Sequence, residues 1–154
     1  MTGAFDHLES DLAEKPLFVC EEPGKPGLDP KLWPEEARQR AFVSWIRGLY
    51  GVGGLHTFSV ANERKGSAIG GERLKRNGLT AGVPDIVVLW DGGIAFCEFK
   101  GFSADRRPGK LSQAQIETCN RIHRNGWPVG CFYTAKAALA FIAEHGAPVG
   151  GNKP

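Results

Sequence analysis

GVPDIVVLWDGGIAFCEFK, residues 82–100, contains two apolar runs separated by a turn. The runs at residues 85–90 and 94–100 are rich in β-branched and aromatic residues, so both are expected to form strands. The intervening Asp91-Gly92-Gly93 is typical of a β-hairpin turn. Because both runs are almost entirely apolar, we expect two buried strands that pair as a hairpin.

The apolar spacing on either side of this hairpin predicts the remaining elements. A helix is expected to begin at Pro34 and to bury a stripe formed by Phe42, Trp45, Ile46 and Leu49. Ser112 and Thr134 are expected to cap two further helices, at residues 112–125 and 135–145. The other expected elements are strands at 55–61 and 128–133 and a short basic helix at 67–77. This order predicts an α/β fold with a mixed central β-sheet flanked by helices.

The chain of 154 residues is expected to form one folded domain at residues 34–146. Residues 1–33 are acidic and rich in Pro and Gly, which predicts a loosely ordered arm, and residues 147–154 are expected to be a flexible tail. Residues 1–36 hold three Lys and nine Asp or Glu, whereas residues 37–154 hold 16 Lys or Arg and eight Asp or Glu. A basic body of this kind suits a protein that binds a polyanion.

Composition excludes several classes of protein. The apolar content of 42% is ordinary for a globular protein, and the longest apolar run, residues 86–90, is too short to span a membrane. Residues 1–12 lack the basic and apolar segments of a secretory signal. The four cysteines form no C-x-x-C pair, which argues against a zinc ribbon and favours reduced thiols in the cytoplasm. No organic cofactor is expected.

Asp85, Glu98 and Lys100 are expected to share one face of the hairpin, because side chains alternate along a strand. Two registers remain open: residue 85 lies opposite either residue 98 or residue 100. Opposed Cβ atoms are about 5 Å apart and diagonal ones about 7–8 Å, so both carboxylates reach one cation in either register. These charged residues could form either a metal site or a cross-strand salt bridge. The apolar flanks favour a metal site, because charges at the ends of buried strands need compensation.

A third carboxylate, Glu35, lies on the helical stripe that also holds Gln39, Phe42 and Ile46, and it therefore points toward the core. An acid that only stabilises the helix dipole is an equally good interpretation. The adjacent stripe is expected to face solvent and consists of Glu36, Arg40, Val43 and Arg47.

Gln115 also has two interpretations. The sequence Ser112-Gln113-Ala114-Gln115 fits a capping box, in which Gln115 reaches back to the backbone of Ser112. Alternatively, the Gln115 amide faces the metal and holds a water molecule or a phosphate oxygen.

Five motifs in this order resemble the PD-(D/E)XK nuclease superfamily and, within it, the VRR-NUC family. They span roughly residues 35–142. Ala61-Asn62 departs from the Pro-Asn that this family pattern leads one to expect. The matching motifs are Glu35-x-x-x-Gln39, Gly78-x-x-x-Gly82-Val83-Pro84-Asp85, Glu98-Phe99-Lys100, Leu111-Ser112-x-x-Gln115 and Gly126-x-Pro-Val129.

The resemblance implies a restriction-endonuclease-like core and a metal-dependent endonuclease that hydrolyses phosphodiester bonds of DNA. It implies that Mg²⁺ or Mn²⁺ is held by Asp85, Glu98, the Phe99 carbonyl and Glu35, with Lys100 and Gln115 as catalytic helpers. Stand-alone members resemble junction resolvases and are often phage-encoded homodimers. The resemblance therefore implies a homodimer that cuts branched DNA, such as a Holliday junction, in the cytosol of a bacterium or a phage-infected host.

Basic residues flank the two central strands in sequence and are predicted to bind DNA phosphates, although a solvated surface is the alternative for each. The dimer interface is predicted to involve residues 51–60 or the arm with Trp33, since neither has an obvious place in the core. The alternative function is a non-catalytic nucleic-acid-binding or assembly subunit. The predicted phosphate-binding residues are Arg64, Lys65, Arg73, Lys75, Arg76, Arg106, Arg107 and Lys110.

Overall fold

The computed structural model describes residues 13–60, 72 and 75–150, which form a five-stranded sheet in the order β1-β5-β4-β3-β2. Its strands are β1 (Val19–Cys20), β2 (His56–Ser59), β3 (Ile86–Trp90), β4 (Gly93–Phe99) and β5 (Val129–Phe132). Strands β2, β3 and β4 are antiparallel, whereas β4, β5 and β1 are parallel, so the sheet is mixed as predicted.

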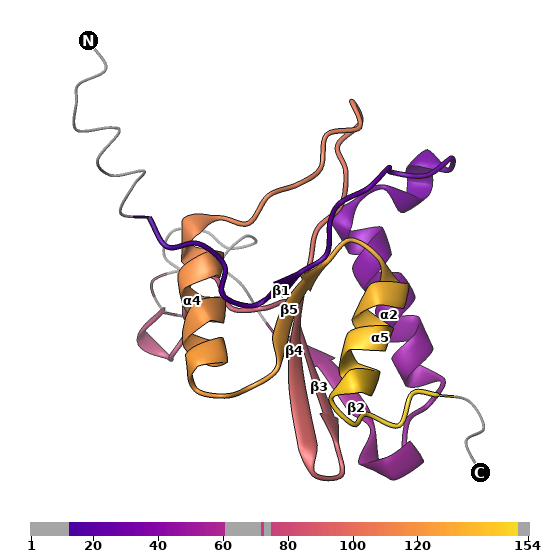
Figure 1. Cartoon of the computed structure of the whole chain (residues 1–154), viewed down its shortest axis with the longest axis vertical. Coiled ribbons are helices and arrows are strands. Elements are labelled where there is room, and N and C mark those ends of the chain that lie inside the picture. The colour runs from indigo at the N-terminus through magenta and orange to yellow at the C-terminus, as the bar shows by residue number, and fades with distance from the viewer. Residues whose placement is uncertain (1–12, 61–71, 73–74, 151–154) are drawn as a thin grey trace.

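Helices cover both faces of this sheet (Figure 1). Two of them, α2 (Glu35–Arg47) and α5 (Ala135–Glu144), lie on one face, and α4 (Gln113–Arg124) lies on the other. Two short 3₁₀ helices, η1 (Pro30–Leu32) and η2 (Val52–Gly54), precede α2 and β2. The predicted α/β class is therefore confirmed. No helix within the described part of the chain is long and apolar enough to cross a membrane.

The hairpin of β3 and β4 has one of the two registers left open by the sequence. Ile86 pairs with Cys97 and Trp90 with Gly93, so the turn consists of residues 91 and 92. Continuing this register by one residue places Asp85 opposite Glu98. The two carboxylates are thus direct neighbours across the strands rather than diagonal ones.

The main core lies between the sheet and helices α2 and α5, where Phe42 and Ile46 are fully buried. Trp45, predicted to belong to the same buried stripe, is instead 53% exposed. One residue along an α-helix corresponds to a rotation of about 100°, so Trp45 lies to the side of the contact that Ile46 makes. The opposite face holds a smaller core beneath α4, which includes Phe18 and Cys119.

The prediction of a loosely ordered arm is wrong for residues 13–33. Val19 and Cys20 add a parallel strand to β5, and the Leu17 N–H donates to Asn120 Oδ1 at 2.8 Å. The Glu21 carboxylate accepts hydrogen bonds from the N–H of Tyr133 and from the N–H and hydroxyl of Thr134, at the start of α5. A strand of two residues leaves no periodic pattern, and its partners lie about 100 residues away in sequence, so local analysis missed it.

The two predicted dimer segments and the C-terminal tail also contribute to the fold. Trp33 is buried against Phe102 and Tyr133, and Leu55 joins the main core. Residues 147–149 were expected to be flexible, but Ala147 and Val149 are buried in that core. Their apolar side chains were too few to give a periodic signal, and only the packed structure shows what they cover.

Candidate metal centre

Three carboxylates from three separate elements meet at one edge of the sheet. Glu35 is the first residue of α2, Asp85 immediately precedes β3, and Glu98 lies near the end of β4. One ligand oxygen from each lies within 4.8 Å of the others. Asp85 and Glu98 are buried, at 7% and 0% exposed, while Glu35 is partly exposed. The structure therefore brings together the acids predicted to bind a metal.

Two glycines permit the close approaches that assemble this centre. A Cβ atom on Gly101 would overlap the backbone of residues 33–35, so glycine lets the start of α2 lie against the end of β4. A Cβ atom on Gly82 would likewise overlap the backbone of Ala114 and Gln115. Larger side chains at either position would push Glu35 or the N-terminus of α4 away from the two strands.

Backbone groups orient the two buried acids. The Phe99 N–H donates to Asp85 Oδ2 at 2.9 Å, and the Asp85 N–H donates to Glu98 Oε2 at 3.2 Å. The N–H and C=O of one strand residue point toward the same edge. The Phe99 carbonyl, a predicted metal ligand, is thus on the side of Asp85.

Lys100 is buried within this acidic group. Its Nζ lies 3.1 Å from Glu98 Oε1 and 3.6 Å from Glu35 Oε2. Placing an ammonium between carboxylates from α2 and β4 ties the helix to the strand. It also sets a positive charge at the point where Asp85, Glu98 and Glu35 converge.

Gln115 forms the predicted capping box and, in addition, contacts one of the acids of the centre. The Ser112 N–H donates to Gln115 Oε1 at 2.9 Å, and the Gln115 N–H donates to Ser112 Oγ, which completes the capping box. The Gln115 amide nitrogen donates to Glu98 Oε1. The amide therefore contacts a predicted metal ligand, whereas the sequence suggested a contact with water or phosphate.

The centre concentrates acidic groups. Among the described residues 13–60, 72 and 75–150, the carboxylates of Glu35, Asp85 and Glu98 lie together beside the ammonium of Lys100. Burial, and to a smaller extent the neighbouring Asp85 charge, raise the pKa of Glu98 to about 8, although Lys100 opposes both effects. The three carboxylate oxygens lie close enough together to hold one metal ion. The donors are all oxygen atoms, which suits hard divalent cations such as Mg²⁺, Mn²⁺ or Ca²⁺.

The predicted phosphate-binding residues do not enter this centre where the structure describes them. Arg107 pairs with Asp105 at 3.2 Å, and the Arg106 guanidinium lies 5.5 Å from the Trp33 ring. Both arginines belong to a loop at residues 101–110 that extends away from the sheet (Figure 1). Lys75, Arg76 and Lys110 are exposed, whereas Arg64, Lys65 and Arg73 lie outside the described residues.

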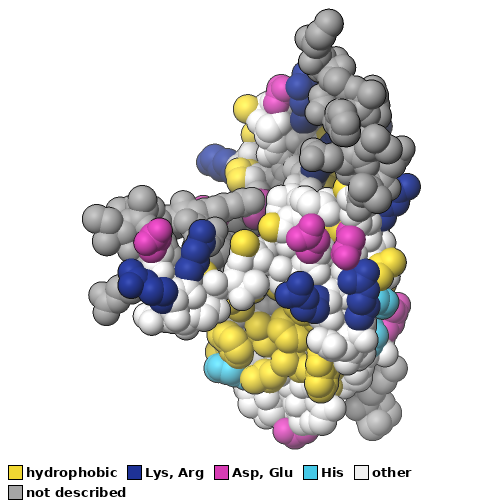
Figure 2. All heavy atoms as spheres, turned by 90° about the vertical axis from the view of Figure 1, so that its left-hand side faces the viewer, with side chains coloured by type: hydrophobic (Ala, Val, Ile, Leu, Met, Phe, Trp, Pro, Cys, Tyr) yellow, Lys and Arg dark blue, Asp and Glu magenta, His cyan; other side chains and the backbone are white. Residues whose placement is uncertain are grey.

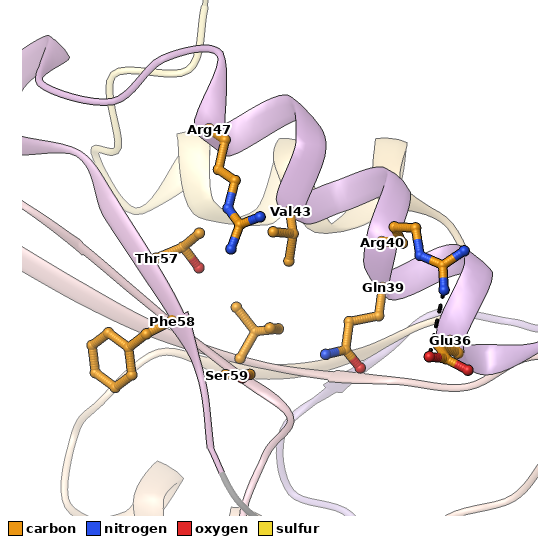
Figure 3. Close-up of a pocket in the computed structure, with 9 residues that line it drawn as sticks. Glu36, Gln39, Arg40, Val43, Arg47, Thr57, Phe58 and Ser59 are labelled. Atoms are coloured by element: carbon orange, nitrogen blue, oxygen red, sulfur yellow. Dashed lines mark hydrogen bonds and ion pairs between the residues drawn. The ribbon is translucent and has the colours of Figure 1, made fainter.

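A groove between α2 and β2 was missed by the sequence analysis (Figure 3). It has a volume of about 220 Å³. The helical stripe that was expected to face solvent forms its α2 wall, because β2 is the outer strand of the sheet and leaves this side of the helix uncovered. The sequence feature that could have indicated this groove is the pair Arg40 and Arg47, which are seven residues apart on α2. The α2 residues that line the groove are Glu36, Gln39, Arg40, Val43 and Arg47.

No protein-family model matches this chain, and neither the curated proteins nor the solved structures gave a significant match.

Proposed function

We propose that this protein is a metal-dependent endonuclease that hydrolyses phosphodiester bonds of DNA on a restriction-endonuclease-like core of the VRR-NUC type. The observation that carries the proposal is the convergence of Glu35, Asp85 and Glu98 within 4.8 Å, with Lys100 in contact with two of them. Carboxylates that are buried this close together are costly unless positive charge compensates them. A divalent cation held by the three acids would add to the compensation that Lys100 provides.

Each residue of the centre has a distinct task in this proposal. When bound, Mg²⁺ or Mn²⁺ supplies Lewis acidity that polarises the phosphate and acidifies a water molecule. Asp85 and Glu98 hold the cation, together with the Phe99 carbonyl and Glu35, directly or through a water molecule. Lys100 stabilises the negative charge that develops on the phosphate oxygens. Gln115 is a positioning residue, because it holds Glu98 through Oε1.

Incubation of the purified full chain with labelled nucleic acids tests the proposal. The panel contains linear duplex, nicked duplex, flap, four-way junction and RNA, each with Mg²⁺, with Mn²⁺ and with EDTA. We expect metal-dependent cleavage that is strongest on branched DNA. Binding without cleavage of any substrate would contradict the proposal and support a non-catalytic nucleic-acid-binding subunit instead.

Lys100→Met is expected to lower cleavage by about 100-fold, because the charge that stabilises the transition state is lost. An ammonium cannot ligate a cation, so the affinity for Mn²⁺ should persist. Cleavage rates and calorimetric titration with Mn²⁺ measure the two effects separately. If Mn²⁺ binding disappears together with activity, Lys100 has a structural task, such as holding Glu35 against Glu98.

The protein is also proposed to act as a homodimer, since paired cuts in a junction need two centres at a fixed spacing. Phe58 on the outer strand β2 is 45% exposed, and hydrophobic side chains gather on the α4 side of the molecule (Figure 2). Light scattering at micromolar concentration should therefore give twice the mass of the chain. A monomer mass, both alone and with a bound junction, would contradict this prediction.

A further inference from the structure

The groove between α2 and β2 is lined by residues that are close in the chain to two acids of the candidate metal centre. Gln39 lies one helical turn after Glu35 and lines the groove. On the opposite wall, Ser59 pairs with Ile86, the residue that follows Asp85. Glu36 and Ile86, which follow Glu35 and Asp85 in the chain, thus line the groove, and Arg47 lines it at the last turn of α2.

Two arginines give this groove a net positive charge. Arg47 is exposed, and its guanidinium extends into the groove (Figure 3). It forms no ion pair with any residue in the described ranges 13–60, 72 and 75–150. Arg40 lies 3.4 Å from Glu36, but both side chains are about three-quarters exposed, so this pair is weak and exchangeable.

The uncharged residues that line the groove include both polar and apolar ones. They are Gln39, Thr57 and Ser59, and Val43, Phe58 and Ile86. The side chain of Gln39 reaches into the groove, and Ser59 faces it from β2 (Figure 3). Amide and hydroxyl groups of this kind commonly bind phosphate and sugar oxygens of nucleic acid without reading the sequence. Arg40 and Arg47 are seven residues apart, which is about 10 Å along the helix axis, so they fit a chain of phosphates better than one small anion.

We propose that this groove binds the sugar–phosphate backbone of the DNA strand that is cut, alongside the phosphate that enters the metal centre. This proposal rests on the proposed nuclease function and adds a strand-binding site to it. Arg40 and Arg47 contact phosphates beyond the reacting one. The groove thereby determines which bond of a bound strand lies next to Asp85, Glu98 and Glu35.

Salt-dependent binding of a labelled DNA duplex tests this inference in EDTA, where no cleavage occurs. The variants are Arg40→Ala, Arg47→Ala and the double variant. Arg121→Ala is the matched control, because Arg121 is exposed on α4, on the opposite face of the sheet. Each lost phosphate contact should reduce the slope of log K against log salt by about 0.9. Arg47→Lys keeps the charge and should keep the slope.

Cleavage assays with Mn²⁺ separate this inference from the proposed function. In the double variant we expect a raised KM and a nearly unchanged kcat, with an unchanged melting temperature. If the slope of log K against log salt in the double variant equals that of the wild type, the strand-binding proposal is wrong, even if the wild-type protein cuts DNA. Conversely, arginine-dependent binding by a protein that cuts nothing would keep the strand site and refute the nuclease.

Competition with inorganic phosphate distinguishes a strand from a single anion. At equal ionic strength, phosphate and chloride should displace the labelled duplex to the same extent. Specific displacement by phosphate that is lost in Arg47→Ala would overturn the inference, because it would identify a site for one phosphate ion.

Discussion

Replacing Asp85 or Glu98 by alanine is expected to reduce DNA cleavage by roughly 1000-fold or more, because losing a ligand removes several kcal/mol of transition-state stabilisation. Both carboxylates are buried at the convergence point with Glu35, and no other described carboxylate belongs to that group. Nicking of plasmid DNA with Mn²⁺ measures the loss, and circular dichroism checks the fold.

A conservative variant distinguishes the loss of a metal ligand from a defect in folding. Glu98→Ala leaves the Gln115 amide and the Asp85 N–H without their acceptor, so Glu98→Gln should be examined beside it. Glu117→Ala is the matched control, since Glu117 is an exposed acid on α4. Full activity of the Asp85 or Glu98 variants would exclude a metal centre at this site.

The metal-free protein is expected to lose stability as the pH rises from about 5 to 8. Glu98 has a pKa of about 8 in the folded protein against an ordinary value of 4.5, because burial and the Asp85 charge disfavour the carboxylate. Between these two values the folded state binds one proton more than the unfolded state. The free energy of unfolding should therefore fall by about 1.4 kcal/mol per pH unit over this interval.

Urea unfolding at several pH values, with EDTA, measures this effect as the difference between the wild-type protein and Glu98→Gln. The variant cannot ionise at this position, so its stability should lack the Glu98 contribution and should exceed that of the wild type at pH 8. Mn²⁺ should remove the Glu98 contribution to the pH dependence of the free energy of unfolding, because a bound cation stabilises the ionised carboxylate. Parallel pH profiles of the two metal-free proteins would contradict a buried, proton-binding Glu98.

The sequence by itself determined the elements whose signals are local. The apolar runs around residues 91–92 predicted the hairpin, and strand alternation predicted that Asp85, Glu98 and Lys100 share a face. Ser112 and Thr134 were recognisable as N-caps because a cap acts within one helical turn. These features depend on neighbours a few residues away, so their spacing is sufficient to identify them.

Only the tertiary structure decided the features that depend on distant partners. The short strand β1 and the Glu21 carboxylate are held by residues more than 100 positions away. Gln115 meets Glu98 because Gly82 allows a close approach to α4. The stripe with Arg40 and Arg47 lines a groove because β2 stands at the edge of the sheet. Spacing along one helix shows which side chains share a face, but what that face meets depends on how the elements pack.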